Sequence, residues 1–439
     1  VVGAGVVGCA IARRFTLQGA RVAVIEKAHD ILDGASKANS AILHTGFDAL
    51  PGSLELSCVR DGYCEYLEIH REMGLPLEKT GAYVVAWNED EIARLDEVSA
   101  RARENGFDDL RLIEPDELRR REPNLSTRAL AAIEIADEAI IDPWSAPYAY
   151  MRQALESGAS IFLACEVTGG EFGDDQWQLE TSRGVLKCRH VINCAGLYGD
   201  TLDQELLGAA KFRIRPRKGQ FVVFDKAASK LLTSVILPVP TSQTKGVVVT
   251  RTVFGNVLVG PTAEDQESRA DTSTDEATLG FLLASACEIV PALQNMPVTA
   301  VYAGLRPATE HKDYQIEAEP DRNWITVGGI RSTGLSGALG IARHVFELYR
   351  GFAPKHDPVR DPGLPRIPVL AENGRRDWQR ASNGGIVCHC ELVTEREVQE
   401  ALTGPLAAQS LSGLKRQTRV TMGRCQGFYC MARLAELTD

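Results

Sequence analysis

Short β-branched and apolar runs between glycine-rich turns recur along this chain of 439 residues. An apolar pair at residues 1–2 is followed by a helix-compatible stretch at 9–18 and a β-branched run at 21–25. This order of strand, helix and strand predicts a parallel βαβ unit. We expect the first of these strands to lack its opening residues. Further strands are predicted at 81–87, 191–193, 220–224, 246–250, 256–259 and 324–327.

The more polar segments predict helices and one connection. Residues 89–122 are charged and follow a helical period, with Pro115 near the middle, so we expect two helices there. After the strand at 324–327, Ser332 and Thr333 can cap a helix over 335–349. Residues 351–385 contain five prolines and several charges, a composition typical of an extended linker.

Gly3, Gly5 and Gly8 form a G-x-G-x-x-G turn between the first strand and the first helix. These glycines permit a tight turn and a close approach to a pyrophosphate, and the helix N-terminus offers N–H groups to the phosphates. Glu26 stands about 20 residues further on, where a carboxylate binds a ribose hydroxyl. The arrangement predicts a dinucleotide site but does not distinguish FAD from NAD. A glycine-rich turn without a ligand is the alternative.

Four cysteines near the C-terminus are clustered as thiolate ligands usually are. Cys388 and Cys390 form a C-x-C pair, and Cys425 and Cys430 form a C-x4-C pair 34 residues later. Structural zinc sites favour two to four residues inside each pair, so the first gap fits zinc poorly. An iron–sulfur cluster is the preferred interpretation. Zinc and unligated thiols remain as alternatives.

Composition narrows the class of protein. The length of 439 residues suggests two or three domains, and the 44% of hydrophobic residues are ample for sizeable cores. The net charge of −11 argues against nucleic acid as a partner. No apolar run of about 18 residues would span a membrane, and we expect no signal peptide. Seven of the 11 cysteines are scattered singly, which favours a reducing compartment. We therefore expect a cytoplasmic protein, with peripheral contact at the inner face of the membrane as a further option.

Seven further segments carry a pattern in a fixed order: 33–46, 51–54, 191–200, 217–220, 260–262, 304–307 and 328–335. In this order they resemble the D-amino-acid oxidase and glycine oxidase superfamily of FAD-dependent oxidoreductases. They are more similar still to its glycerol-3-phosphate and L-2-hydroxyglutarate dehydrogenases. The cysteine region resembles the [2Fe-2S] domain of bacterioferritin-associated ferredoxin. The cofactors implied are FAD and a [2Fe-2S] cluster on the four cysteines.

The resemblance implies an α/β chain, α+β overall, with a Rossmann-like FAD domain, an antiparallel-sheet substrate domain and a small helical [2Fe-2S] domain that carries the four cysteines. A helix that begins near residue 335 would point its N-terminus at the flavin and stabilise negative charge on reduction. The expected domains are FAD binding at 1–80, 140–210 and 304–350, substrate cap at 81–139 and 211–303, linker at 351–385, and cluster domain at 386–439.

Residues that match the family's flavin contacts are expected to bind FAD here. The expected cofactor-binding residues are Gly3, Gly5, Gly8, Glu26, Lys27, Ser36, Lys37, Asn39, Ser40, Val167, Ala195, Gly196, Gly304, Gly329, Ile330, Ser332 and Gly334.

Three side chains are candidates for the chemistry. His44 matches a histidine close to the flavin, and an imidazole can accept a hydroxyl proton near neutral pH. Arg306 and Arg331 each stand in a glycine-bounded turn, and a guanidinium there suits a carboxylate or phosphate. The alternative is that either arginine pairs with a protein carboxylate. Lys218 and His311 lie in matching segments, and their roles stay open.

The interpretation is an FAD- and [2Fe-2S]-dependent dehydrogenase for a small anionic 2-hydroxy acid or polyol phosphate. Electrons would pass through the cluster to an acceptor protein or a quinone. One alternative is an amino- or imino-acid dehydrogenase of the opine, hydroxyproline or glycine type, which shares the fold and the fused cluster domain. A second is a non-catalytic flavoprotein that senses redox state.

Overall fold

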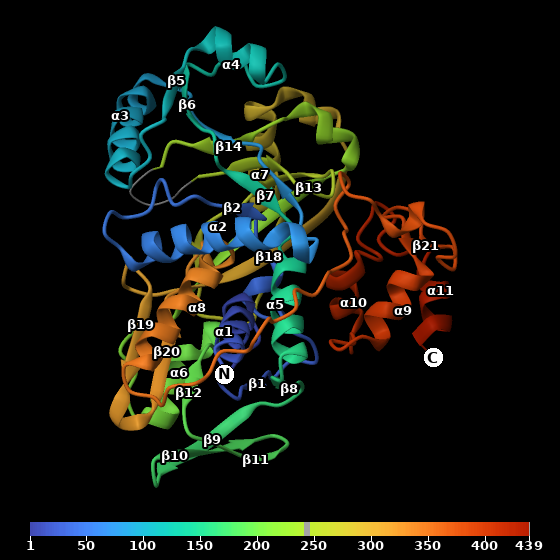
Figure 1. The fold of residues 1–439 in the computed structure, drawn as a ribbon. Helices are drawn as coiled ribbons and strands as arrows, with labels where there is room; N and C mark the ends of the chain where they lie inside the picture. The colour runs from blue at the N-terminus through green and yellow to red at the C-terminus, as the bar shows by residue number, and fades with distance from the viewer. Residues whose placement is uncertain (241–245, 439) are drawn as a thin grey trace.

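Separated segments of the chain build one largely parallel sheet at the centre of an N-terminal body (Figure 1). The computed structural model describes residues 1–240 and 246–438. Val2 forms parallel bridges to both Ile25 and Asn193 and so joins the strands on its two sides. The order across the sheet is β8, β1, Val2, β12, β20 and β19, with β19 antiparallel. The strands are β1 (Ala23–Ile25), β8 (Ser160–Phe162), β12 (Val191–Asn193), β19 (Gln315–Glu319) and β20 (Trp324–Gly328).

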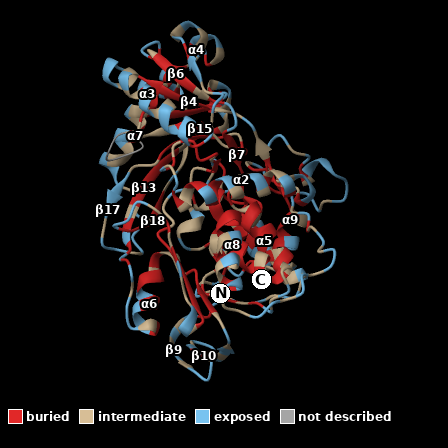
Figure 2. Ribbon diagram, turned by 60° about the vertical axis from the view of Figure 1, so that its left-hand side comes forward, coloured by how far each residue is buried: buried red, intermediate tan, exposed pale blue. Residues whose placement is uncertain are grey.

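Helices cover one face of this sheet, and a small second sheet with α6 covers the other (Figure 2). Successive strand residues point to opposite faces. Ile192 and Ile325 therefore pack among the helices, whereas Val191 and Trp324 pack with Trp177 of the small sheet. The helices are α1 (Val6–Leu17), α2 (Leu54–Met73), α5 (Ser145–Glu156), α6 (Gly199–Leu207) and α8 (Gly334–Arg350), and the small sheet is β9 (Val167–Gly173), β10 (Gln176–Thr181) and β11 (Gly184–Cys188).

A large, mainly antiparallel sheet forms a second domain beside the body (Figure 1). Its order is β17, β13, β16, β15, β14, β4, β6 and β5, and β18 pairs with β13. Helix α7 packs on one face and α3 on the other. The strands are β4 (Ala82–Ala86), β5 (Arg111–Ile113), β6 (Ala131–Ile135), β13 (Arg215–Phe224), β14 (Val235–Pro238), β15 (Val248–Arg251), β16 (Val257–Gly260), β17 (Glu264–Asp265) and β18 (Val298–Ala308), and the helices are α3 (Glu89–Glu104), α4 (Pro115–Arg121) and α7 (Glu276–Ile289).

A three-stranded sheet in the order β2, β7, β3 lies between these two layers. In β2 (Ile42–Leu43) and β7 (Ala139–Ile141), Leu43 stands opposite Ala139 in an antiparallel register. The third strand is β3 (Leu77–Glu78). Continuing the β2–β7 register by one position brings residue 44 opposite residue 138, which matters for the site.

The structure confirms most of the predicted elements and corrects three details. The charged stretch contains the two predicted helices, α3 and α4, but also β5 between them, and Pro115 is the first residue of α4. The helix predicted over 335–349 is α8, yet no side chain caps it. The Thr333 hydroxyl instead donates to Glu55 at 2.6 Å. The expected domain boundary at residue 304 falls inside β18, which pairs with β13 along its length.

The connection at 351–385 is extended, as predicted, but it is packed along the body and is not a free spacer. The amide N–H groups of Val359 and Ile367 donate to main-chain carbonyls of α1 and α2, each within 2.9 Å. Leu370 and Ala371 are buried against the large-sheet domain. The short 3₁₀ turn Asp377–Gln379 is the regular element of this connection.

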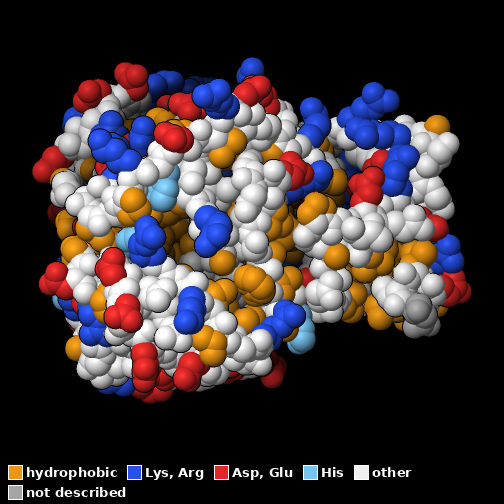
Figure 3. All heavy atoms as spheres, turned by 60° about the horizontal axis from the view of Figure 1, so that its bottom comes forward, with side chains coloured by type: hydrophobic (Ala, Val, Ile, Leu, Met, Phe, Trp, Pro, Cys, Tyr) orange, Lys and Arg blue, Asp and Glu red, His pale blue; other side chains and the backbone are white. Residues whose placement is uncertain are grey.

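The C-terminal domain is a small helical unit that lies against the side of the body (Figures 1 and 3). Its core contains Cys388, Cys430, Leu414 and Val420. No helix in the described ranges, 1–240 and 246–438, is long and apolar enough to cross a membrane. The elements of the domain are β21 (Ile386–Cys388), β22 (Val393–Thr394), α9 (Glu395–Thr403), α10 (Leu411–Thr418) and α11 (Met431–Thr438).

Candidate active site and cofactor sites

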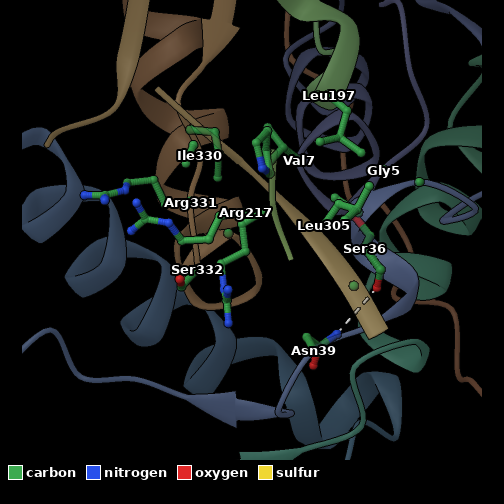
Figure 4. A pocket seen from close by; sticks show the side chains of 18 of the residues that line it. Gly5, Val7, Ser36, Asn39, Leu197, Arg217, Leu305, Ile330, Arg331 and Ser332 are labelled. Atoms are coloured by element: carbon green, nitrogen blue, oxygen red, sulfur yellow. Dashed lines mark hydrogen bonds between the residues drawn. The ribbon is translucent and has the colours of Figure 1, made fainter. Parts of the chain in front are cut away.

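A cavity of about 1470 Å³ runs from the glycine turn of the body to the large sheet. In Figure 3 one face of the body is hollowed, and Lys, Arg and His side chains stand at the rim. Figure 4 shows Gly5, Ser36 and Asn39 toward one end of the pocket, and Arg217 and Arg331 toward the other. The volume suits a dinucleotide together with a small substrate, since a drug-sized ligand needs about 300–1,000 Å³.

The glycine turn leaves open backbone where a pyrophosphate would lie. Gly3 has φ of 101°, and a Cβ there would stand 2.4 Å from the carbonyl oxygen of Cys194. A Cβ on Gly5 would stand 3.1 Å from the hydroxyl oxygen of Ser36, which accepts a hydrogen bond from the Val6 amide at 2.9 Å. Helix α1 begins at Val6 with no acidic residue in its first turn. The turn therefore fits a dinucleotide phosphate group.

Glu26 directly follows β1, beside this turn. Its carboxylate accepts hydrogen bonds from the amides of Ala4 (2.7 Å) and Ala28 (2.9 Å). Burial raises the pKa of Glu26, and the two amides partly oppose that shift. The side chain is thus held at the edge of the cavity where the resemblance places a ribose.

Strand β18 approaches the segment that carries Ser36 and Asn39 very closely. A Cβ on Gly304 would stand 2.7 Å from the Cβ of Ala38, and the Tyr302 hydroxyl donates to the Asn39 carbonyl at 2.8 Å. This contact closes the cavity between the body and the large sheet.

All but one of the expected cofactor-binding residues line the cavity. The exception is Gly329, which has φ of 66° and lies against Gln315 of β19. It permits the turn after β20 and does not face the cavity. The lining residues are Gly3, Gly5, Gly8, Glu26, Lys27, Ser36, Lys37, Asn39, Ser40, Val167, Ala195, Gly196, Gly304, Ile330, Ser332 and Gly334.

His44 lines the cavity and is held by a carboxylate that no sequence pattern indicated. Its Nδ1 lies 2.9 Å from Oε2 of Glu138, and Glu138 is fully buried. The other oxygen of Glu138 accepts from the amide (2.7 Å) and the hydroxyl (2.9 Å) of Thr45. Because a carboxylate accepts hydrogen bonds, this contact places the imidazole proton on Nδ1 and the lone pair on Nε2.

Two arginines stand opposite each other on paired strands at the far end of the cavity. Arg217 of β13 is the register partner of Arg306 of β18. Arg217 is paired with Asp265 at 2.6 Å, whereas Arg306 donates one bond, to the carbonyl of Thr262 at 3.1 Å. The Nη1 of Arg306 is buried and has no hydrogen-bond partner among the described residues.

Electrostatics in this cluster favour an anion. Burial, and then the charges of Arg217 and Arg331, lower the pKa of Arg306 to about 10. Arg331 lies at the rim, where it donates to the carbonyl of Lys312 at 3.3 Å. Like charges directly opposite each other on a sheet are destabilising. A bound phosphate or carboxylate would relieve that repulsion and satisfy the unpaired N–H of Arg306.

The two residues with open roles are placed differently. Lys218 is buried and does not line the cavity; its ammonium contacts Asp271 at 3.1 Å and Ser273 at 3.3 Å. His311 lines the cavity near its rim and lies 3.7 Å from Glu310.

The four C-terminal cysteines are arranged as two facing pairs, Cys388 with Cys430 and Cys390 with Cys425. Burial first, and then Cys388, raise the pKa of Cys430 to about 11. The amide of Tyr429, followed by other neighbours, lowers the pKa of Cys425. No three His, Cys, Asp or Glu side chains in the described part of the chain converge tightly enough to hold a single metal ion. Backbone N–H groups around a thiolate fit a cluster held by cysteines.

The family model for FAD dependent oxidoreductases matches residues 1–348. The chain belongs to this family. The model for the BFD-like [2Fe-2S] binding domain matches residues 386–439. The protein is therefore an FAD-dependent oxidoreductase with a fused [2Fe-2S] domain, and its cofactors are FAD and a [2Fe-2S] cluster.

Known relatives of this oxidoreductase carry related names. The chain is 35% identical over its whole length to a glycerol 3-phosphate dehydrogenase of Caloramator mitchellensis, covering 92% of that protein. It is 27% identical over its whole length to a subunit of the anaerobic glycerol-3-phosphate dehydrogenase of Escherichia coli, covering 87% of that subunit. The structure is similar to dithionite-reduced L-alpha-glycerophosphate oxidase from Mycoplasma pneumoniae with FAD bound. That match has a TM-score of 0.78 and 28% identity, and it covers 84% of this chain and 97% of the other.

Sequence reasoning missed Glu138 and the part that Arg217 plays. Glu138 directly precedes the apolar run of β7, but nothing local connects it to a histidine 94 positions away. Arg217 belongs to a segment already matched to the family, yet its position opposite Arg306 follows from the register of two distant strands.

Proposed function

We propose that this oxidoreductase oxidises glycerol 3-phosphate at its secondary hydroxyl group and passes the electrons out through the [2Fe-2S] domain. The observation that carries the substrate is the convergence of Arg217, Arg306 and Arg331, with an unpaired buried N–H on Arg306. A phosphate dianion matches this excess of positive charge better than a single carboxylate does. The names of the relatives point to the same substrate.

His44 and Glu138 would supply the proton chemistry. FAD, when bound, supplies the acceptor for the hydride that leaves the carbon. His44 would take the hydroxyl proton on Nε2, since Glu138 holds Nδ1. Glu138 also accepts from the backbone amide of Thr45, so the imidazole is oriented by the backbone that follows β2 as well as by the carboxylate. The arginines hold the phosphate and thereby place the hydroxyl group toward His44.

The electron acceptor is proposed to be another protein. Phe428 and Tyr429 stand between two of the cysteines, are 82% and 74% exposed, and pack edge to face with ring centroids 5.1 Å apart. Exposed aromatic side chains of this kind are enriched at protein interfaces. A protein docked on them would lie next to Cys425 and Cys430. The other acceptor that a test should include is a quinone. In that case this protein, located in the cytoplasm, would contact the membrane peripherally.

The experiment is an anaerobic substrate panel on the purified protein. Glycerol 3-phosphate should remove the absorbance of oxidised flavin at lower concentration than L-2-hydroxyglutarate, glycine or hydroxyproline. Faster bleaching by an amino or imino acid would replace the proposal with that activity. No bleaching by any member of the panel would indicate a redox-sensing flavoprotein.

A further inference from the structure

The C-terminal domain contacts the segment that forms one wall of the FAD site. The segment comprises residues 30–37, and its first residue, Asp30, is buried. Its carboxylate accepts hydrogen bonds from the amide of Gln409 at 2.9 Å and from the hydroxyl of Ser410 at 2.6 Å. Ser410 is the N-cap residue of α10 and accepts from the amide of Gly413 at 3.0 Å. One carboxylate of the body thus fixes the start of a helix that belongs to the cluster domain.

The approach at this point leaves no spare room. A Cβ on Gly413 would stand 2.3 Å from Cγ of Asp30. A side chain at position 413 would therefore force the two surfaces apart, because a well-packed contact has no room for an added methyl group.

Arg416, one turn further along α10, makes a second contact with the same segment. Only 4% of Arg416 is exposed. Its guanidinium donates to the carboxylate of Asp33 at 3.2 Å and to the carbonyl of Ile31 at 3.1 Å. It also donates to Ser412 at 2.9 Å on its own helix. Without Arg416, the buried carbonyl of Ile31 would lose this donor.

The contacted segment is hydrogen-bonded to the glycine turn and to the first turn of α1. Leu32 is fully buried with φ of 64°, and its amide donates to the carbonyl of Ala4 at 3.0 Å. The 3₁₀ turn Ala35–Lys37 follows, and Ser36 accepts from the amide of Val6. Residues 30–37 therefore connect α10 of the cluster domain to the first turn of α1, where a pyrophosphate would bind.

Helix α10 is in turn part of the cluster domain's core. Leu414 packs in one apolar cluster with Cys388 and Cys430. The helix that carries Arg416 is thus held by the same core that contains two of the four cysteines.

We propose that the cluster domain completes the FAD site, with Arg416 as a positioning residue that holds residues 30–37 in the conformation FAD requires. Thermodynamic linkage makes the effect reciprocal, so bound FAD must also stabilise the docking of α10. This inference concerns cofactor affinity, so it stands or fails independently of the substrate proposed above.

The first test measures FAD release from the full-length holoprotein. FAD that dissociates on dilution becomes fluorescent. The dependence of this fluorescence on protein concentration gives the dissociation constant of FAD. Arg416→Ala should weaken FAD binding about tenfold, within the range of about 5- to 150-fold usual for coupled sites. Arg416→Lys keeps the positive charge but not the planar set of donors, so its FAD affinity should lie between those of the wild type and Arg416→Ala. The matched control is Arg433→Ala, because Arg433 pairs with Glu395 and Glu436 inside the cluster domain.

A second variant tests the proposal in case Arg416→Ala fails to fold. Asp30 does not line the cavity, so Asp30→Asn leaves a single acceptor oxygen for the Gln409 amide and the Ser410 hydroxyl without touching FAD. It should weaken FAD binding severalfold while the iron content stays as in the wild type. Amide hydrogen exchange in residues 411–418 should slow when FAD is added, and this protection should be lost in Arg416→Ala. Wild-type FAD affinity in both Asp30→Asn and an iron-loaded Arg416→Ala would overturn the proposal.

Discussion

Replacing Arg306 by Met should move stability and substrate affinity in opposite directions. The folded protein lowers the pKa of Arg306 to about 10, from an ordinary value above about 12, chiefly through burial. A lowered pKa of a basic group means that the fold disfavours its charge. Keeping Arg306 charged in the folded state costs about 3 kcal/mol of folding stability. This cost is fully present below pH 10 and shrinks as the pH rises through that value.

Met removes that cost, but the replacement also loses the hydrogen bond to Thr262, which is worth about 1 kcal/mol. We expect a net gain of about 1–2 kcal/mol without substrate, or about 1–2 °C in the unfolding midpoint of a chain of this length. The same change removes a buried donor to the phosphate, a loss of about 2–5 kcal/mol in binding. Apparent affinity for glycerol 3-phosphate should therefore fall at least tenfold.

Two measurements on the same samples test whether stability and substrate affinity change in opposite directions. Scanning calorimetry without substrate gives the unfolding midpoint, and anaerobic stopped-flow reduction at increasing glycerol 3-phosphate gives the apparent affinity. Arg213→Met serves as the control, because Arg213 is exposed and is 3.5 Å from an exposed Glu267. A lower midpoint together with unchanged affinity in Arg306→Met would refute the reasoning, since Arg306 would then be a structural residue.

Three further changes address the other parts of the site. Gly5→Val places a branched side chain about where Ser36 already stands, so the purified protein should contain little flavin, measured as the ratio of flavin to protein. Glu138→Gln removes the carboxylate that orients His44, and it should slow flavin reduction about 10- to 100-fold with little change in apparent substrate affinity; an equal loss in both would indicate a general defect instead. Cys425→Ser should lose iron by metal analysis, while glycerol 3-phosphate still bleaches flavin when FAD is supplied in excess. Full iron retention in that variant would exclude Cys425 as a ligand.

Local sequence was sufficient for the elements that carry their own signals. The glycine turn with Glu26, four strands of the large sheet (β4, β13, β15 and β16) and helix α8 follow from periodicity and turn residues within about 25 positions, whereas its other strands were not predicted. The spacing of the four cysteines likewise favoured an iron–sulfur cluster over zinc, and the matching domain is a [2Fe-2S] binding one. The predicted side-chain cap of α8 was wrong, because the hydroxyl of Thr333 donates to Glu55 and leaves the helix uncapped.

Only the tertiary structure decided which side chains meet. Glu138 reaches His44 because β2 and β7 pair in a fixed register, and Arg217 faces Arg306 because β13 and β18 do. The linker composition predicted an extended segment but not its packing along the body, nor the contact of Arg416 with residues 30–37 from nearly 400 positions away. Periodicity reports which face of an element is buried, whereas strand register and domain docking depend on the complementary surface, which lies elsewhere in the chain.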